Sequence, residues 1–323
     1  MTSNKIISIC IPTYNRSETV YRLLTQIISF DLKDILDVIV IDDASTDDTY
    51  QHLIGLADGG DIRISRNEKN AGLTGNILNC FNECNTEYLI YMADDEILYK
   101  DGIEELIILL EDFKPDFLTT QWDRLDHMAR ESKKLKEISL LDIEAFAYHG
   151  PGLVFKKSYI DFTKPYLLSR LDKGCTAAFF LPLIILLIVG KLNDSKFFSS
   201  PILLGGFPKE GVLTSNVLDS KGEHYHSLTN LLNRYVDLEQ FYKEMLVEFA
   251  SSKYLTDLKL LLDSHKLSLY FLLEMGIGVK SPKLISDFRR GALRASMHPL
   301  GAIKSLINYI SMKVKLFIYR IQN

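Results

Sequence analysis

The sequence contains few cysteines and no long uninterrupted apolar run. Its four cysteines, among 323 residues, form no Cys-x-x-Cys pair and no metal-ligand spacing. The longest apolar run, residues 177–189, is too short to span a bilayer and contains Pro182, which favours a buried helix or an interfacial segment. The opening residues lack the apolar stretch of a signal peptide. We therefore expect a protein of the reducing cytoplasm.

The composition is that of an ordinary globular protein. Apolar residues make up 47% of the chain and charged residues 24%, so a sizeable core can be buried. The length suits one large domain or two smaller ones.

The net charge of −5 is unevenly distributed. Residues 283–323 carry one acid, Asp287, against eight basic residues, which gives this segment +7 and leaves −12 for residues 1–282. Apolar residues alternate with these basic ones, and basic amphipathic helices bind anionic membrane surfaces. A helix packed on the catalytic domain or on a partner subunit is an equally good interpretation.

Strand and helix patterns alternate along the first 125 residues. The predicted strands of this part are residues 6–11, 38–41, 61–65, 88–92 and 117–121, and a further strand is expected at 152–155. Between them lie helical patterns at 17–27, with Ser17 as N-cap, and at 46–56, 74–84 and 101–113. Such alternation predicts an α/β fold with a mostly parallel sheet flanked by helices, whose ligands bind at the carboxyl ends of the strands.

Polar clusters fall at four of these predicted strand ends. They are Thr13–Arg16, Asp42–Asp43, Asn70–Gly72 and Asp94–Glu96. Asp94 and Asp95 follow an apolar strand, and a buried pair of adjacent carboxylates needs a cation. Hard oxygen ligands favour Mg²⁺ or Mn²⁺. Taken alone, the pair would more simply be a solvated turn that caps the next helix.

The other clusters allow a nucleotide interpretation. A carboxylate after the second strand, Asp42 or Asp43, can accept hydrogen bonds from a ribose or a base. Gly72 permits positive φ and a close backbone approach. The alternatives are a helix N-cap near Ser45 or Thr46, and a plain turn at Asn70.

Four motifs, IPTYNRSETV, VIDDASTDDT, RNEKNAGLTGNIL and YLIYMADDEILYKDGIEEL, resemble in order and spacing the nucleotide-binding half of family 2 glycosyltransferases, which have the GT-A fold. The resemblance covers roughly residues 5–120. It implies that Asp94 and Asp95 form the DXD-type motif for metal and diphosphate, with Asp95 the direct ligand of Mn²⁺ or Mg²⁺ and Glu96 a third carboxylate. It also implies that the following residues bind the nucleotide: Pro12, Tyr14, Arg16, Asp42, Asp43, Asn70 and Gly72.

The resemblance further implies an inverting displacement with a carboxylate base from the middle of the chain. Asp172 occupies a suitable place before the apolar run, although a loop carboxylate paired with Lys173 explains it equally well. Asp123 and Asp126 are the next candidates. His224 and His226 form a further candidate ligand pair, with a structural role the commoner one for such a histidine.

These features predict a metal-dependent glycosyltransferase with a UDP-sugar as the expected donor and a saccharide or lipid-linked saccharide as acceptor, acting in surface polysaccharide synthesis. We expect it in the cytoplasm, with peripheral membrane contact or an oligomer interface through the C-terminal helices, and no nucleic-acid partner. Residues 1–215 would form the GT-A domain, with 1–120 its nucleotide half and 121–215 its acceptor half, and 216–323 a helical region.

Two other functions compete with this prediction. A catalytically degenerate binding module would keep the fold without turnover. A sugar nucleotidyltransferase would need a Gly-rich basic loop after the first strand, which Pro12–Arg16 does not provide.

Overall fold

The computed structural model describes residues 5–57, 62–123, 134–143, 150–171, 180–208 and 239–263. The chain divides into two compact units, residues 1–225 and 226–323. In the first unit the strands are β1 (Ile7–Thr13), β2 (Leu36–Asp42), β3 (Ile62–Arg66), β4 (Tyr88–Tyr91), β5 (Ile97–Leu98), β6 (Phe117–Asp123), β7 (Lys136–Glu137), β8 (Leu153–Lys156) and β9 (Phe197–Gly206). The helices are α1 (Ser17–Ile28), α2 (Thr49–Ala57), α3 (Gly72–Glu83), α4 (Lys100–Phe113), α6 (Lys157–Leu171) and α7 (Phe180–Leu192), with a 3₁₀ turn at Leu140–Asp142.

One nine-stranded sheet organises the first unit, in the order β3-β2-β1-β4-β8-β6-β9-β5 with β7 beside β9. The half that contains β3, β2, β1 and β4 is parallel. Beyond β4 the sheet is mixed, since β8 runs antiparallel to both β4 and β6 while β6 and β9 are parallel. The predicted α/β sheet is confirmed, and its parallel part is formed by β1 to β4 of the first 91 residues.

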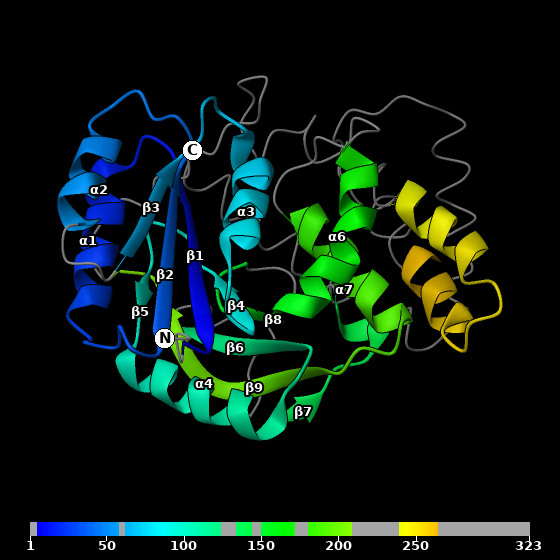
Figure 1. The fold of residues 1–323 in the computed structure, drawn as a ribbon. Coiled ribbons are helices and arrows are strands. Elements are labelled where there is room, and N and C mark those ends of the chain that lie inside the picture. Colours follow the sequence, from blue (N-terminus) through cyan, green and yellow to red (C-terminus); the bar gives the residue numbers. More distant parts are fainter. Residues whose placement is uncertain are drawn as a thin grey trace, which may run out of the picture. The chain divides into compact units, whose positions relative to one another are not determined.

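Both faces of the parallel half are covered, which explains the continuous apolar strands. Every residue of β1 and of β2 is buried. Figure 1 shows α1 and α2 on one side of these strands and α3 on the other. The stripe Val20, Leu23, Leu24 and Ile27 of α1 packs into the core with alternate residues of β1, as its helical spacing predicts.

The strand β5 shows how the sheet ends near the acidic loop. It is an edge strand of two residues that pairs with β9 on one side. On the other side, the Gln26 side-chain amide of α1 donates to the Leu98 carbonyl at 3.1 Å and accepts from the Leu98 N–H at 3.2 Å. A side chain thus takes the place of a neighbouring strand and fixes the segment after Asp95 to α1.

A polar network lies at the opposite, amino ends of the strands. Arg63 of β3 donates through Nε and Nη2 to both oxygens of Asp37, at 2.9 and 2.6 Å, and the Ser8 hydroxyl donates to the same carboxylate at 3.0 Å. Burial alone would raise the pKa of Asp37, but the hydrogen bonds and charge of Arg63, with Ser8, hold that pKa below its ordinary value. This network joins β1, β2 and β3 away from the predicted site.

We expect Arg63→Gln to lower the free energy of unfolding by on the order of 1 kcal/mol at pH 7, a value discounted because the Arg63 side chain is 41% exposed. Because the Asp37 pKa is depressed in the folded protein, this contribution is present above the ordinary carboxyl pKa and is lost as the pH falls through the depressed value. Urea unfolding at pH 7 and pH 3 measures it. Lys100→Gln, which breaks the exposed pair with Glu104, is the control and should change little. Equal stability losses in the two variants would contradict the assignment.

Most predicted elements are present, with differences at their ends. The N-cap prediction at Ser17 is wrong, because Arg16 occupies that position and no side chain caps the helix. Residues 180–189 of the apolar run lie in helix α7, and residues 186–190 are buried. No helix in the described ranges is long and apolar enough to cross a membrane. In the second unit, residues 239–248 and 255–263 are helical. The boundary near 215 stays a prediction.

Candidate active site

The acidic pair lies where the sequence places it, immediately after β4 at the carboxyl end of the parallel strands. Asp94 is 6% exposed, whereas the Asp95 side chain is 20% exposed. The Thr13 hydroxyl, at the end of the neighbouring strand β1, donates to Oδ2 of Asp94 at 2.7 Å. Thr13 was in a predicted polar cluster but not among the predicted site residues. The two strand ends therefore meet at Asp94.

Arg16 joins both carboxylates. Its Nη1 lies 3.2 Å from Oδ1 of Asp94 and 2.6 Å from Oδ2 of Asp95. A second arginine, Arg22 of α1, donates to the backbone carbonyl of Asp95 at 3.0 Å. The carboxylates thus converge on one positively charged group, while the backbone of the loop is held separately.

Burial raises the pKa of Asp94 to about 6, against the opposing charge of Arg16. Asp95 adds to the rise by repulsion, and the Thr13 hydrogen bond opposes it. Burial likewise raises the pKa of Tyr91, the last residue of β4, and repulsion from Asp94 adds to this rise. The site therefore favours any cation that can neutralise the pair.

A divalent metal fits these residues. One nitrogen of Arg16 already contacts an oxygen from each carboxylate, so a single cation can bind both. No group of three or more His, Cys, Asp or Glu side chains suited to a metal occurs in the part of the chain that the structure describes. Mg²⁺ sites commonly use one or two carboxylates and complete their shell with water and substrate phosphates, so two suffice. Glu96 is buried at 3% exposure, and its predicted role as a third ligand stays a prediction.

Asp43 follows β2 and is held by amides. Its Oδ1 accepts hydrogen bonds from the Asn67 side chain at 2.7 Å and from the Ala71 N–H at 2.8 Å. Asn67 is in turn held by Asn76 and Asn79 of α3. Sequence reasoning missed all three asparagines; the spacing of three between Asn76 and Asn79 on α3 was the available signal. The network fixes the direction of the Asp43 carboxylate.

Its neighbour Asp42 is wholly buried and differs in its partners. Oδ2 of Asp42 accepts from the Ser45 N–H and pairs with Arg66, both at 3.1 Å. Oδ1 accepts no hydrogen bond from the described residues. Asp42 therefore holds the loop after β2 through Oδ2, while Oδ1 has no hydrogen-bond donor among the described residues.

The loops after β1 and β2 are tied together. The Asn15 side chain accepts from the Thr46 N–H at 2.8 Å, and the Asn15 N–H donates to the Ser45 hydroxyl at 2.8 Å. Pro12 is buried within β1, whereas Tyr14 at the tip of the first loop is 42% exposed. Among the predicted nucleotide-binding residues of this loop, Tyr14 offers an accessible ring and Arg16 a charge.

Asn70 and Gly72 form the turn that opens α3. The Gly72 N–H donates to Oδ1 of Asn70 at 2.8 Å, and Gly72 has φ 73°, a conformation that favours glycine. The Ala71 N–H between them contacts Asp43. The turn thus belongs to the same cluster as the acid after β2.

Asp123 is the candidate base that the structure describes. It ends β6, and its Oδ2 accepts from the Tyr99 hydroxyl at 3.0 Å. Gly206 of β9 pairs with both Asp123 and Ile97. A Cβ on Gly206 would lie 2.6 Å from the Asp123 Cβ, so only glycine leaves room there. Strand β9 therefore lies between Asp123 and β5, the strand that follows Asp95.

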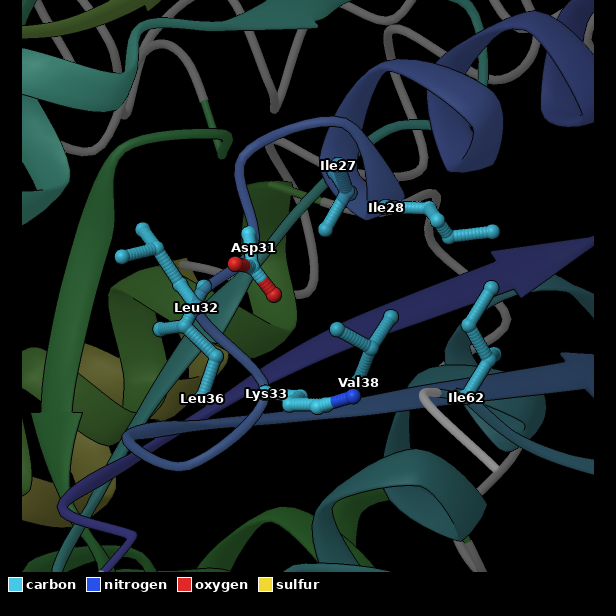
Figure 2. Close-up of a pocket in the computed structure, with 8 residues that line it drawn as sticks. All are labelled: Ile27, Ile28, Asp31, Leu32, Lys33, Leu36, Val38 and Ile62. Atoms are coloured by element: carbon cyan, nitrogen blue, oxygen red, sulfur yellow. The ribbon is translucent and has the colours of Figure 1, made fainter. Parts of the chain in front are cut away.

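The other predicted site residues lie outside the described residues: Asp126, Asp172, His224 and His226. A hollow elsewhere lies between the end of α1 and the start of β2 (Figure 2). Its lining is apolar apart from two charged side chains: Ile27, Ile28, Asp31, Leu32, Lys33, Leu36, Val38 and Ile62. It contains none of the acids considered above.

The family model described as glycosyl transferase family 2 matches residues 8–179, more than half of the chain. The chain belongs to glycosyltransferase family 2. The matched region contains Asp43, Asp94, Asp95 and the candidate base Asp172, so the resemblance of the four motifs is confirmed.

Two curated relatives give the family some context. The poly(ribitol-phosphate) beta-N-acetylglucosaminyltransferase TarS of Staphylococcus aureus is 21% identical over 255 residues, which are 76% of this chain and 43% of TarS. The uncharacterized protein MT1568 of Mycobacterium tuberculosis is 30% identical over 161 residues, or 47% of each chain. The family 2 chain thus spans less than half the length of these relatives.

Solved structures confirm the GT-A fold. The S. aureus TarS 1–349 structure in complex with UDP-GlcNAc has a TM-score of 0.63 at 18% identity, covering 94% of this chain and 89% of the other. The mannosyltransferase PcManGT from Pyrobaculum calidifontis, in complex with GDP-Man and Mn²⁺, has a TM-score of 0.51 at 16% identity, covering 97% and 87%.

Proposed function

We propose that this family 2 chain is a metal-dependent, inverting glycosyltransferase that moves a sugar from a UDP-sugar to a hydroxyl of a saccharide or lipid-linked saccharide. The observation that carries the proposal is the convergence of Asp94 and Asp95 on a single cation at the end of β4, two strands from Asp43. The complexes of the fold relatives with UDP-GlcNAc, and with GDP-Man and Mn²⁺, support a nucleotide-sugar donor. The poly(ribitol-phosphate) substrate in the name of TarS supports a surface polymer as acceptor.

The nucleotide end of the donor belongs at Asp43. With Oδ1 held by Asn67 and Ala71, its other oxygen, Oδ2, accepts no hydrogen bond from the described residues and can accept from an N–H of the base, such as that of uracil. The exposed Tyr14 ring lies on the adjoining loop and offers a face for stacking. With the base bound at Asp43, the diphosphate of the donor would extend toward Asp94 and Asp95.

Asp94 and Asp95 would hold Mn²⁺ or Mg²⁺, which when bound supplies Lewis-acid stabilisation of the departing diphosphate. The acceptor oxygen attacks the anomeric carbon as the bond to the diphosphate oxygen breaks, which inverts the configuration. The chain must take the acceptor proton with a base within hydrogen-bond reach. We assign that role to Asp172, ahead of Asp123.

A donor-hydrolysis screen tests the proposed function. UDP-, GDP-, CDP- and dTDP-sugars are incubated with the protein and Mn²⁺, and released nucleotide is measured. We expect UDP-sugars to be hydrolysed and Asp43→Ala to weaken UDP binding about 10- to 100-fold, the cost of one hydrogen bond to a charged group.

Glu68→Ala, at an exposed residue near Asn67, is the control for the Asp43 variant and should bind UDP normally. Nucleotide binding without hydrolysis of any donor would instead identify a degenerate binding module. If Asp43→Ala binds UDP as tightly as the wild type does, Asp43 does not contact the nucleobase.

A further inference from the structure

The position of Arg16 bears directly on how the metal enters this site. Oδ2 of Asp95 and Oδ1 of Asp94 both contact Nη1 of Arg16, while Oδ2 of Asp94 accepts from Thr13. A metal held by both carboxylates would occupy the place beside them that the guanidinium now fills. Metal and guanidinium therefore compete for the same two carboxylates.

The contact is partly shielded from water, which makes the competition matter. The Arg16, Asp94 and Asp95 side chains are 19%, 8% and 20% exposed. Charge pairs at such depth are screened less by solvent and salt than surface pairs. A metal that arrives alone must displace Arg16 from both carboxylates and brings no anion to replace them.

The donor changes this balance. A diphosphate brings several negative oxygens, and a guanidinium binds phosphate through two parallel hydrogen bonds. If the metal arrives with the diphosphate, Arg16 exchanges its two carboxylate contacts for contacts with phosphate oxygens. Arg22 and Gln26 hold the loop backbone at Asp95 and Leu98 during such an exchange.

We propose that Arg16 is a built-in competitor of the metal, which makes metal binding depend on the nucleotide diphosphate. This rests on the proposed function, because it assumes that Asp94 and Asp95 hold the metal. Thermodynamic linkage requires that the nucleotide also binds more tightly in the presence of the metal, by the same factor.

The test is calorimetric titration of Mn²⁺ into the full chain without nucleotide. We expect Arg16→Gln to bind Mn²⁺ at least tenfold more tightly than the wild type, while the factor by which UDP improves Mn²⁺ affinity falls at least tenfold. Lys100→Gln is the matched control, since it also removes one positive charge, at an exposed residue of α4 that pairs with Glu104. Its Mn²⁺ affinity should equal that of the wild type.

Thermal unfolding checks that each variant is folded. Arg16→Lys is the second variant if Arg16→Gln does not fold; lysine keeps the charge but lacks the planar fork, so we expect an intermediate Mn²⁺ affinity. Unchanged or weaker Mn²⁺ binding in the folded Arg16 variant would overturn the inference. If UDP and Mn²⁺ show no mutual enhancement even in the wild type, the proposed metal-dependent function fails as well.

Discussion

Asp95→Asn is expected to lower the rate of donor hydrolysis by about 10³-fold at saturating Mn²⁺. The carboxylate is the better exposed member of the pair and contacts the Arg16 cation at 2.6 Å, which marks it as the more accessible ligand. Stabilisation of a developing diphosphate charge by a metal contributes several kcal/mol, and about 4 kcal/mol corresponds to the stated factor. The rate of nucleotide release, with the sugar nucleotide that the screen selects, measures the loss.

Asp101→Asn provides the matched control for this variant. Asp101 is an exposed carboxylate in the first turn of α4, six residues further along the chain. We expect its turnover to stay within about twofold of the wild type, as is usual for surface substitutions. Near-normal turnover in Asp95→Asn would show that Asp95 does not hold the metal.

The second large effect is expected at Asp172. Asp172→Asn should lower hydrolysis by about 10²- to 10⁴-fold, the usual contribution of a general base, while leaving UDP affinity unchanged. Separate binding and rate measurements are needed, because a base acts on the acceptor proton and not on the bound nucleotide.

Asp123→Asn is the informative comparison for the base. Asp123 lies one strand from the Asp95 segment and is hydrogen-bonded by Tyr99, so it is the competing carboxylate within the described residues. We expect Asp123→Asn to retain most of the turnover. A large loss in Asp123→Asn with near-normal turnover in Asp172→Asn would transfer the role to Asp123.

The parallel half of the fold and its acids could be predicted because the signals are local. Continuous apolar runs mark strands covered on both faces, and the acids that follow them must lie at one edge of the sheet. The chain order therefore indicated where Asp43, Asp94 and Asp95 lie, and the resemblance to family 2 glycosyltransferases supplied their expected roles. Their environment confirms the placement, since Asp94 is buried and hydrogen-bonded by Thr13 from the next strand end.

The remaining features depend on contacts between residues far apart in sequence. Strand β9 pairs with β5 and β6, and nothing in residues 197–206 alone indicates those partners. The direction of the Arg16 side chain is also a long-range property, because its partners lie 78 and 79 residues away. The resemblance implied that Arg16 binds the nucleotide, whereas in the structure its guanidinium contacts the two carboxylates.

This position of Arg16 links the acidic pair to the nucleotide site. Arg16 lies on the loop that also carries Tyr14 and Asn15, and Asn15 is bonded to the loop that follows Asp43. A donor bound at Asp43 would thus contact the same chain segment that supplies the competing charge. We therefore expect nucleotide and metal to bind cooperatively.

Calorimetric titration of UDP into the wild-type chain, with and without Mn²⁺, measures directly whether the acidic pair holds a metal. We expect at least tenfold tighter UDP binding with Mn²⁺, and loss of that difference in Asp95→Asn. Equal UDP affinity with and without Mn²⁺ would contradict the assignment of Asp94 and Asp95 as the metal-binding pair.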